Sequence, residues 1–442
     1  MTPVVEKLGS AVDDWVAANH AQLVSTRRHL HAHPELAFAE FETTSFLEQR
    51  LRAVGLAPRR LPTGTGLVCE VGSGGPVVVL RADIDALPLP DLKDVPYAST
   101  REGWCHACGH DVHTTVVLGV LTALASLDGL PGTVRAIFQP AEETIPGGAT
   151  EVVASGVLDG ASRAFALHCD PSVPAGTIGL RTGAITAACD RIDITLLGPG
   201  GHTARPQLTV DLVDALGRLI TDLPGLLSRQ IDPRSGMSLV WGAVNAGVAA
   251  NAIPQRGTVR GTVRVLDRDA WKGAEEMMRQ LVARVAATTG AGCEVDYVRG
   301  LPPVVNDPRA VALMRAAALE TVGGEHVVVT PQSMGGEDFG WFAEVLPIAL
   351  ARLGTHGGGP ALDLHRGTFD VDERAIGIGV RLMARTALHA MEADAGPGRP
   401  GKPAPGDTAG RRTAEQKREP DDESSRAAGR AAGRAAPERR RD

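Results

Sequence analysis

The chain has few aromatic residues and no long apolar run. Phe, Trp and Tyr make up only 3% of its 442 residues, and no segment reaches the 18 or so uninterrupted apolar residues of a membrane-spanning helix. Its six cysteines are irregularly spaced, which excludes the disulfide framework of a small secreted protein. The first residues also lack the basic-then-apolar pattern of a secretory signal. These absences predict a cytoplasmic protein.

Glycine and proline, by contrast, are plentiful, with 52 and 30 residues. Together with 43% hydrophobic residues over this length, they predict a globular protein of two or three domains with many short loops. The charge is unevenly distributed. Residues 396–442 hold 12 Lys and Arg against 8 Asp and Glu, which leaves 33 against 44 in the preceding body. The acidic body argues against nucleic-acid binding.

The densest group of possible metal ligands is in residues 103–114, which read G-W-C-H-A-C-G-H-D-V-H-T. Three imidazoles, two thiols and one carboxylate lie in these twelve positions. Thiolate and imidazole suit zinc, cobalt, nickel or manganese. Because few of the six side chains can reach one point together, we interpret the segment as one half of a two-metal hydrolytic site.

A redox motif, a haem attachment site and a structural zinc clip fit this segment less well. Cys105 and Cys108 have the C-x-x-C spacing of redox proteins, but histidines crowd the pair, which is not typical of a thioredoxin-like motif. Attachment of a c-type haem requires His directly after the second Cys, where this chain has Gly109. A structural zinc clip usually has a second C-x-x-C, which the chain lacks.

Three predicted strands indicate where the remaining ligands come from. Each is a short apolar run, and each is followed by acidic or imidazole side chains. In open α/β sheets, chemistry gathers at the carboxyl ends of the strands. The strands and the side chains that follow them are 77–81 with Asp83 and Asp85, 133–138 with Glu142 and Glu143, and 163–167 with His168.

The pattern changes at about residue 187. An alternating strand at 191–196 begins a β-α-β-β-α-β order, which is typical of a ferredoxin-like module. Because the α/β pattern resumes near residue 307, we predict an inserted domain. The module's other predicted elements are a helix at 209–223, strands at 237–243 and 255–265, a helix at 270–289 and a strand at 293–299.

Both ends of the chain carry further signals. A helix is expected over residues 4–30, and it leads into a segment with His29 and His33, which we expect to line or brace the site. Residues 396–442 contain no Val, Ile, Leu, Met or aromatic residue and are predicted to be disordered. The predicted domains are a catalytic domain in two parts, 1–186 and 301–393, an inserted domain, 187–300, and a disordered tail, 394–442.

The order of the motifs resembles one family. The chain is similar to the metal-dependent amidohydrolases that include aminoacylase-like enzymes, hippurate hydrolases and indole-acetyl-amino-acid hydrolases. The resemblance covers roughly residues 25–375. It is carried by R-R-H-L-H-A-H-P-E-L, R-A-D-I-D-A-L-P, H-A-C-G-H-D-V-H-T, Q-P-A-E-E, L-H-C-D-P, G-G-H-T-A-R-P, N-A-I-P, G-E-D-F and L-H-R-G-T-F-D-V-D-E.

This resemblance implies a fold and a reaction. The fold would be α/β, with a phosphorylase/hydrolase-like catalytic domain around a mixed central sheet and an inserted ferredoxin-like α+β lid and dimerisation domain. The reaction would be hydrolysis of an N-acyl or N-aroyl amino acid to a carboxylic acid and a free amino acid. The alternatives are a dipeptidase- or carboxypeptidase-like enzyme and an acetyl-diamino-acid deacetylase with the same binuclear site. A homodimer or higher homo-oligomer is expected.

The resemblance also implies roles for individual residues. Two divalent ions (Zn, Mn, Co or Ni) would be bound by Cys108, His110, Glu143, His168 and His365. Glu142 would be the general base, and Asp85 and Asp111 would orient the ligands. His202 in the lid would stabilise the oxyanion, and Asn251 and Arg264 would contact the substrate.

The chain departs from the family pattern at three positions. Cys105 stands where the family usually has Met, Gly336 stands where it has Ser, and Cys169 follows His168 where a non-thiol residue is expected. The extra thiols leave the identity of the metal open and do not alter the expected ligand set.

Overall fold

The structure is a computed structural model that describes residues 2–359 and 363–395. Most of the predicted tail therefore lies outside the described residues. Within those ranges, none of the helices has the length and hydropathy that a membrane crossing requires.

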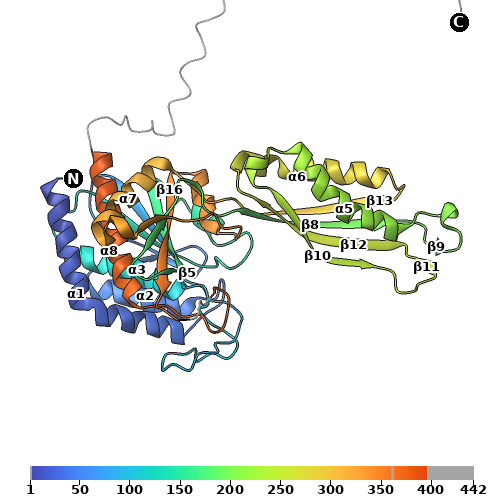
Figure 1. Ribbon diagram of the computed structural model, residues 1–442. Helices are drawn as coiled ribbons and strands as arrows, with labels where there is room; N and C mark the ends of the chain where they lie inside the picture. Colours follow the sequence, from blue (N-terminus) through green and yellow to red (C-terminus); the bar gives the residue numbers. More distant parts are fainter. Residues whose placement is uncertain (1, 360–362, 396–442) are drawn as a thin grey trace, which may run out of the picture. The chain divides into compact units, whose positions relative to one another are not determined.

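An eight-stranded mixed sheet forms the centre of the catalytic domain (Figure 1). Its order is β1-β2-β4-β3-β5-β16-β6-β15, and the four strands β4, β3, β5 and β16 run parallel. This sheet confirms the predicted mixed α/β fold. Its strands are β1 (Arg59–Arg60), β2 (Leu67–Gly72), β3 (Val77–Asp83), β4 (Thr133–Gln139), β5 (Ala161–Pro174), β6 (Ile178–Leu180), β15 (Val327–Val329) and β16 (Ile348–His356); β7 (Gly183–Ala184) and β14 (Val305–Asn306) form a small separate pair.

Helices cover both faces of this sheet. On one face, α3 (His110–Ala125) is buried along almost its whole length, because it packs against the sheet, α1 (Pro3–Ala32) and α8 (Arg374–Ala395), and α8 itself also contacts the sheet. The apolar character of α3 all the way round is typical of such a helix. The opposite face is covered by α4 (Ala149–Ala154) and the 3-10 segment η4 (Asp338–Glu344). The other helices of this domain are α2 (Phe41–Ala53), α7 (Pro308–Val322) and η3 (Gly324–His326).

The inserted domain has its own sheet and core. Its four strands lie in the order β10-β12-β8-β13, all antiparallel, and α5 and α6 pack on one face (Figure 1). This is the predicted ferredoxin-like arrangement, with a two-stranded ribbon added at one end. Its elements are β8 (Ala188–Leu197), β9 (Gly201–His202), η1 (Pro206–Leu208), α5 (Leu212–Gln230), η2 (Pro233–Ser235), β10 (Ser238–Ala246), β11 (Ala252–Ile253), β12 (Arg256–Val265), α6 (Arg268–Ala287) and β13 (Gly292–Leu301).

A buried carboxylate ties this inserted domain together where β8 begins. Asp190 accepts hydrogen bonds from the Trp271 indole N–H at 3.0 Å, the Tyr297 hydroxyl at 2.6 Å and the Gly300 backbone N–H at 2.8 Å. Only 1% of Asp190 is exposed, so water cannot replace these bonds. One side chain thereby joins β8 to α6 and to the end of β13.

We expect the substitution Asp190→Ala to lower the stability of the inserted domain by at least about 2 kcal/mol, because three buried donors lose their acceptor. Hydrogen exchange of the β8 and β13 amides at increasing urea concentration measures this loss. The matched control is Asp193→Ala, which removes only ion pairs of 3.6 Å to the exposed Arg191 and Arg260 and should cost less than about 1 kcal/mol. Equal losses in the two variants would contradict the anchoring role.

Candidate metal centre and active site

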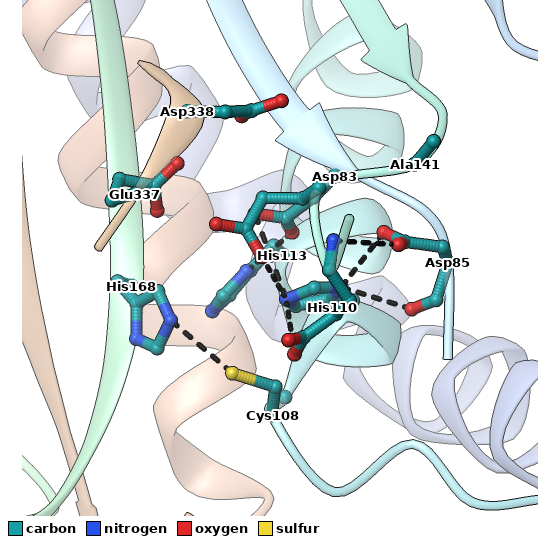
Figure 2. Close-up of polar contacts among 12 residues, drawn as sticks. Asp83, Asp85, Cys108, His110, His113, Ala141, His168, Glu337 and Asp338 are labelled. Carbon is teal, nitrogen blue, oxygen red and sulfur yellow. Dashed lines mark hydrogen bonds and ion pairs between the residues drawn. The ribbon is translucent and has the colours of Figure 1, made fainter. Parts of the chain in front are cut away.

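Polar side chains meet at the carboxyl ends of β3 and β4, next to the middle of β5 (Figure 2). Asp83 ends β3, Glu142 and Glu143 follow β4, and His168 lies on β5. Parallel strands place their carboxyl ends at one edge of a sheet, which explains why segments far apart in sequence converge. The fifth contribution is His110, the first residue of α3.

A glycine brings the start of α3 against β5. Gly109 precedes the helix with φ 87°, in the left-handed region. A Cβ atom at this position would lie 2.8 Å from the Cys169 sulfur and 2.9 Å from its Cβ. Glycine is therefore required for both the backbone conformation and the close approach. The residues on either side of Gly109, Cys108 and His110, reach the site as a result.

Backbone carbonyl groups fix the orientation of two imidazoles. His110 Nδ1 lies 2.9 Å from the carbonyl oxygen of Asp85, and His168 Nδ1 lies 2.8 Å from that of Cys169. Because a carbonyl only accepts, Nδ1 must be the donor in both rings. In the neutral form of each ring, Nε2 is then left with a lone pair for a metal ion.

His113 differs from these two histidines because both of its nitrogens are engaged. Its Nδ1 donates to Asp83 at 2.6 Å, and its Nε2 accepts the backbone N–H of Cys169 at 2.8 Å. His113 therefore braces β3 against β5 and has no lone pair left for an ion. Neither His113 nor Asp83 could be given a role from the sequence, because the tautomer depends on groups that only the fold brings together.

The donor atoms form overlapping groups of the size that a metal ion requires. Within each group they lie within 4.8 Å of one another, and ligands that share a zinc ion at about 2.0–2.3 Å have similar separations. Cys108 Sγ is 3.5 Å from His168 Nε2, and His365 Nε2 is 3.3 Å from Glu143 Oε1. Three of these groups are Cys108–His110–His168, Cys108–Glu143–His365 and His110–Glu142–Glu143.

These residues fit divalent cations on chemical grounds as well. His110 Nε2 is buried and has no hydrogen-bond partner among the described residues. Burial and the Glu143 carboxylate raise the pKa of the Cys108 thiol well above its usual value, so a thiolate there needs a neighbouring cation. Since Cys108 belongs to two of the three groups, its sulfur could contribute to two adjacent ions.

A buried excess of acid surrounds these groups. Burial and the neighbouring Glu337 and Glu143 raise the pKa of Glu142 well above its usual range. Burial likewise raises the pKa of Asp338 to about 8, although Arg81 opposes the shift. The buried Arg81 guanidinium bonds Asp83 at 2.7 Å and Asp338 at 2.6 Å. Arg81, Glu337 and Asp338 lie in the motifs R-A-D and G-E-D-F, but neither motif indicated a role for them from sequence alone.

Two non-glycine residues of the site have left-handed backbone conformations. Ala141 has φ 58° and His365 has φ 59°. An alanine rarely adopts this conformation, and such residues cluster at functional sites. Ala141 is fixed by the bond from its N–H to the buried Glu40 carboxylate at 2.9 Å, and His365 by the bond from its N–H to the Ala107 carbonyl at 2.8 Å. The conformation of Ala141 directs the neighbouring Glu142 toward the cluster, and that of His365 directs its own imidazole there.

The two residues expected to orient ligands differ in position. Asp85 contacts two expected ligands: its Oδ1 lies 3.3 Å from His110 Nδ1, and its Oδ2 accepts the Glu143 N–H at 2.9 Å. Asp111 has no hydrogen bond with the side chain of an expected ligand in the described residues. It accepts a hydrogen bond from Arg27 at 2.7 Å and lies 2.8 Å from His31, both on α1. Asp111 therefore anchors α3 to α1.

The expectation for the first-helix histidines was wrong. His29 stacks on the Phe46 ring, and His33 packs on His29; among the described residues neither contacts the cluster. The intervening His31 is the buried one. Although its burial acts in the opposite direction, Asp111 and Asp91 raise the pKa of His31 to about 10, so it carries a proton and acts as a structural cation.

The two thiols of the C-x-x-C pair have different neighbours in the fold. Cys108 faces His168, whereas the Cys105 sulfur lies 3.7 Å from the Lys93 ammonium. Both are buried free thiols with different partners. This geometry favours the metal interpretation of residues 103–114 over the redox one.

The three lid residues lie at two different ends of the inserted sheet. His202 on β9 pairs with Ala252 on β11, directly after Asn251, so these two candidates are neighbours. Arg264 lies near the other end of β12, opposite Cys189, and donates to the Met334 carbonyl at 3.0 Å. Among the described residues, none of the three has a hydrogen bond or ion pair with the metal-site cluster.

Comparisons with known proteins agree with this geometry. The B. subtilis YXEP protein, described as a dinuclear metal-binding peptidase of family M20, has a crystal structure that matches with a TM-score of 0.76 and 35% identity over 85% of this chain and 99% of that chain. N-acetylcysteine deacetylase of Bacillus subtilis (strain 168) is 37% identical over 379 residues, which are 85% of this chain and 98% of that protein.

Another relative is longer than this chain. A protein of Rhodococcus jostii (strain RHA1) with a glutamate–cysteine ligase name is 46% identical over 370 residues, and the match spans 83% of this chain but only 46% of that protein. The chain thus spans about half the length of this relative. The model of peptidase family M20/M25/M40 matches residues 79–389, most of the chain. The chain therefore belongs to peptidase family M20/M25/M40.

Proposed function

We propose that the protein is a metal-dependent amidohydrolase that cleaves N-acyl or N-aroyl amino acids into a carboxylic acid and a free amino acid. The observation that carries this proposal is the buried Glu142 carboxylate, 3.9 Å from His110 Nε2 and directly before Glu143 in the overlapping donor groups. A proton carrier beside two cation-binding groups is an arrangement that catalyses amide hydrolysis. The deacetylase name of one relative supports the same reaction class.

The ions would be held by Cys108, His110, Glu143, His168 and His365. When bound, they would polarise the amide carbonyl and lower the pKa of a water molecule from 15.7 towards about 7. Their identity among Zn, Mn, Co and Ni is left to measurement, because thiolate, imidazole and carboxylate together suit several of them.

Glu142 would move the proton. In its ionised form the carboxylate accepts a proton from the attacking water, and in its protonated form it donates that proton to the departing amine. Burial and the neighbouring Glu337 raise the pKa of Glu142. A raised pKa favours the return of the proton to the amine nitrogen, because a more weakly acidic carboxyl holds its proton until the amine leaves.

His202 would supply a hydrogen bond to the oxyanion. Its Nδ1 accepts the backbone N–H of Ala204 at 3.0 Å, so Nε2 carries the ring proton and can donate. His202 lies beyond the far end of β8, whose ten residues span about 30 Å from the junction with the catalytic domain. We propose that it reaches the site of a second copy in a homodimer.

A peptidase is the alternative function. The YXEP protein is described as a peptidase, and a dipeptide presents the same amide bond with a free amine on the acyl side. Release of amino acid from N-acetyl, N-benzoyl and N-indoleacetyl amino acids, compared with release from dipeptides, separates the two. Preference for dipeptides would overturn the N-acyl assignment and retain the hydrolytic site.

Glu142→Gln should lower kcat by about 10²–10⁴-fold and leave metal content unchanged, because the amide keeps the shape but cannot accept the proton. Amino-acid release by metal-loaded protein measures the effect. Glu151→Gln, at an exposed position of α4, is the matched control and should retain full activity. A Glu142→Gln enzyme with normal kcat would refute the assigned base.

Metal stoichiometry tests the ligand set. The wild-type chain should bind about two divalent ions, and His168→Ala and His365→Ala about one each, because each histidine belongs to one of the two Cys108 groups. Cys108→Ser should lose both. Elemental analysis after dialysis under reducing conditions measures this, with Cys293→Ser in the inserted domain as the control. Retention of both ions by Cys108→Ser would show that the sulfur is not shared.

His202→Ala should lower kcat without loss of metal, because the side chain contacts no donor group. A mixture of His202→Ala and Glu142→Gln proteins, refolded or exchanged together, should be more active than either parent if the histidine acts across a dimer. A mixture no more active than its parents, with subunit exchange demonstrated, would place His202 in its own subunit's site.

A further inference from the structure

A cavity of about 600 Å³ opens beside the metal centre. It is formed where the end of β5, the segment after β15, β16 and the His365 segment come together. Cys169 and Leu364 in its lining directly adjoin the expected ligands His168 and His365 in the chain. The other lining residues are Asp170, Pro171, Ser172, Thr330, Pro331, Gln332, Ser333, Arg352, Asp363 and Arg366.

The strand register places Arg352 next to a metal ligand. β16 pairs with β5 in parallel, and Arg352 is the partner of His168. Paired residues on adjacent strands project from the same face of the sheet, and the strands are about 4.8 Å apart. The guanidinium of Arg352 therefore leaves the sheet alongside the His168 imidazole.

A glycine keeps the other side of Arg352 open. Gly179 on β6 is its antiparallel partner, and a Cβ at Gly179 would lie 3.2 Å from the Arg352 Cβ and 2.9 Å from that of Thr330. Any larger residue would crowd the arginine from this side. The absence of a side chain there leaves the start of the Arg352 side chain free to extend into the cavity.

Some charged side chains of the cavity have hydrogen-bond or ion-pair partners, and one does not. Asp170 accepts from the Ser172 N–H and hydroxyl, and Arg366 faces Asp363 at 4.0 Å. Half-buried Arg352, in contrast, has no hydrogen bond or ion pair with any residue in the described ranges. Arg264, the arginine expected from the sequence, is engaged by the Met334 carbonyl.

An unpaired cation at this position opposes the binding of metal cations, since like charges repel. An arginine whose only role is to contact water could lie at many other surface positions without repelling the metal ions. A carboxylate in the cavity would relieve it and would find in Arg352 the planar, two-pronged donor that suits it.

We propose that Arg352 determines substrate specificity by binding a carboxylate of the substrate in this cavity. The inference rests on the proposed function, because it assigns the group that is held while the amide lies at the metal centre. The carboxylate comes either from the α-position of the released amino acid or from its side chain. Both sources have the same chemistry, and the experiment separates them.

Equilibrium binding to the metal-loaded Glu142→Gln protein tests the inference without turnover. The probes are N-acetyl-L-alanine, which has only the α-carboxylate, the α-amide of N-acetyl-L-aspartic acid, which has only the side-chain carboxylate, and N-acetyl-L-alaninamide, which has neither. At least one of the two acids should bind about 10- to 100-fold more tightly than the neutral amide. The tighter acid identifies the source.

Arg352→Met, added to this protein, should abolish the preference of the tighter acid over the neutral amide, and Arg352→Lys should restore part of it. The matched control is Arg309→Met, which removes an exposed arginine at the start of α7 and should leave the preference intact. Equal metal content in all variants shows that the site is formed.

Three results would overturn the inference: no binding of any probe, no preference for either acid, or a preference that survives Arg352→Met. Hydrolysis of the same acids by the otherwise unchanged enzyme is measured in parallel. Absence of hydrolysis of these acids would refute the proposed function. The binding preference would still decide the role of Arg352.

Discussion

The organisation of this site depends on an excess of buried negative charge. Glu142, Glu337, Asp83 and Asp338 lie close together at one edge of the central sheet, and the buried Arg81 forms ion pairs with the last three of them. In a low-dielectric interior such a group is unstable unless cations are added or protons are retained. The raised pKa values of Glu142 and Asp338 show the second response. Binding of divalent ions is the first.

The excess of buried negative charge also explains why the orientation of the imidazoles matters. An ion adds charge only where lone pairs point at it, and backbone carbonyls fix His110 and His168 in the tautomer that leaves Nε2 free. His113 is held in the same tautomer, but its Nε2 already accepts a backbone N–H. Three histidines of similar burial thus have two different functions, and the difference lies in whether a backbone N–H occupies Nε2.

Much of this was predictable from the sequence, for identifiable reasons. The strands before Asp85, Glu143 and His168 are short apolar runs, and parallel strands bring their ends together whatever the details. The inserted module was recognisable from its alternating strands. What could not be predicted depends on register and helix phase. His31 faces the interior while His29 and His33 do not, and Arg352 is one more residue of a strand until its pairing with His168 is known.

The connection of the inserted domain has a consequence for how such proteins change over time. Its first and last strands leave the catalytic domain side by side, since Cys189 pairs with Leu301, and its hydrophobic core is built from its own residues. The two points of attachment are therefore adjacent, and the catalytic fold spans them without a long bridging segment. Such a domain can be lengthened, reshaped or exchanged for another domain with adjacent ends. The buried carboxylates of the catalytic domain then keep their positions.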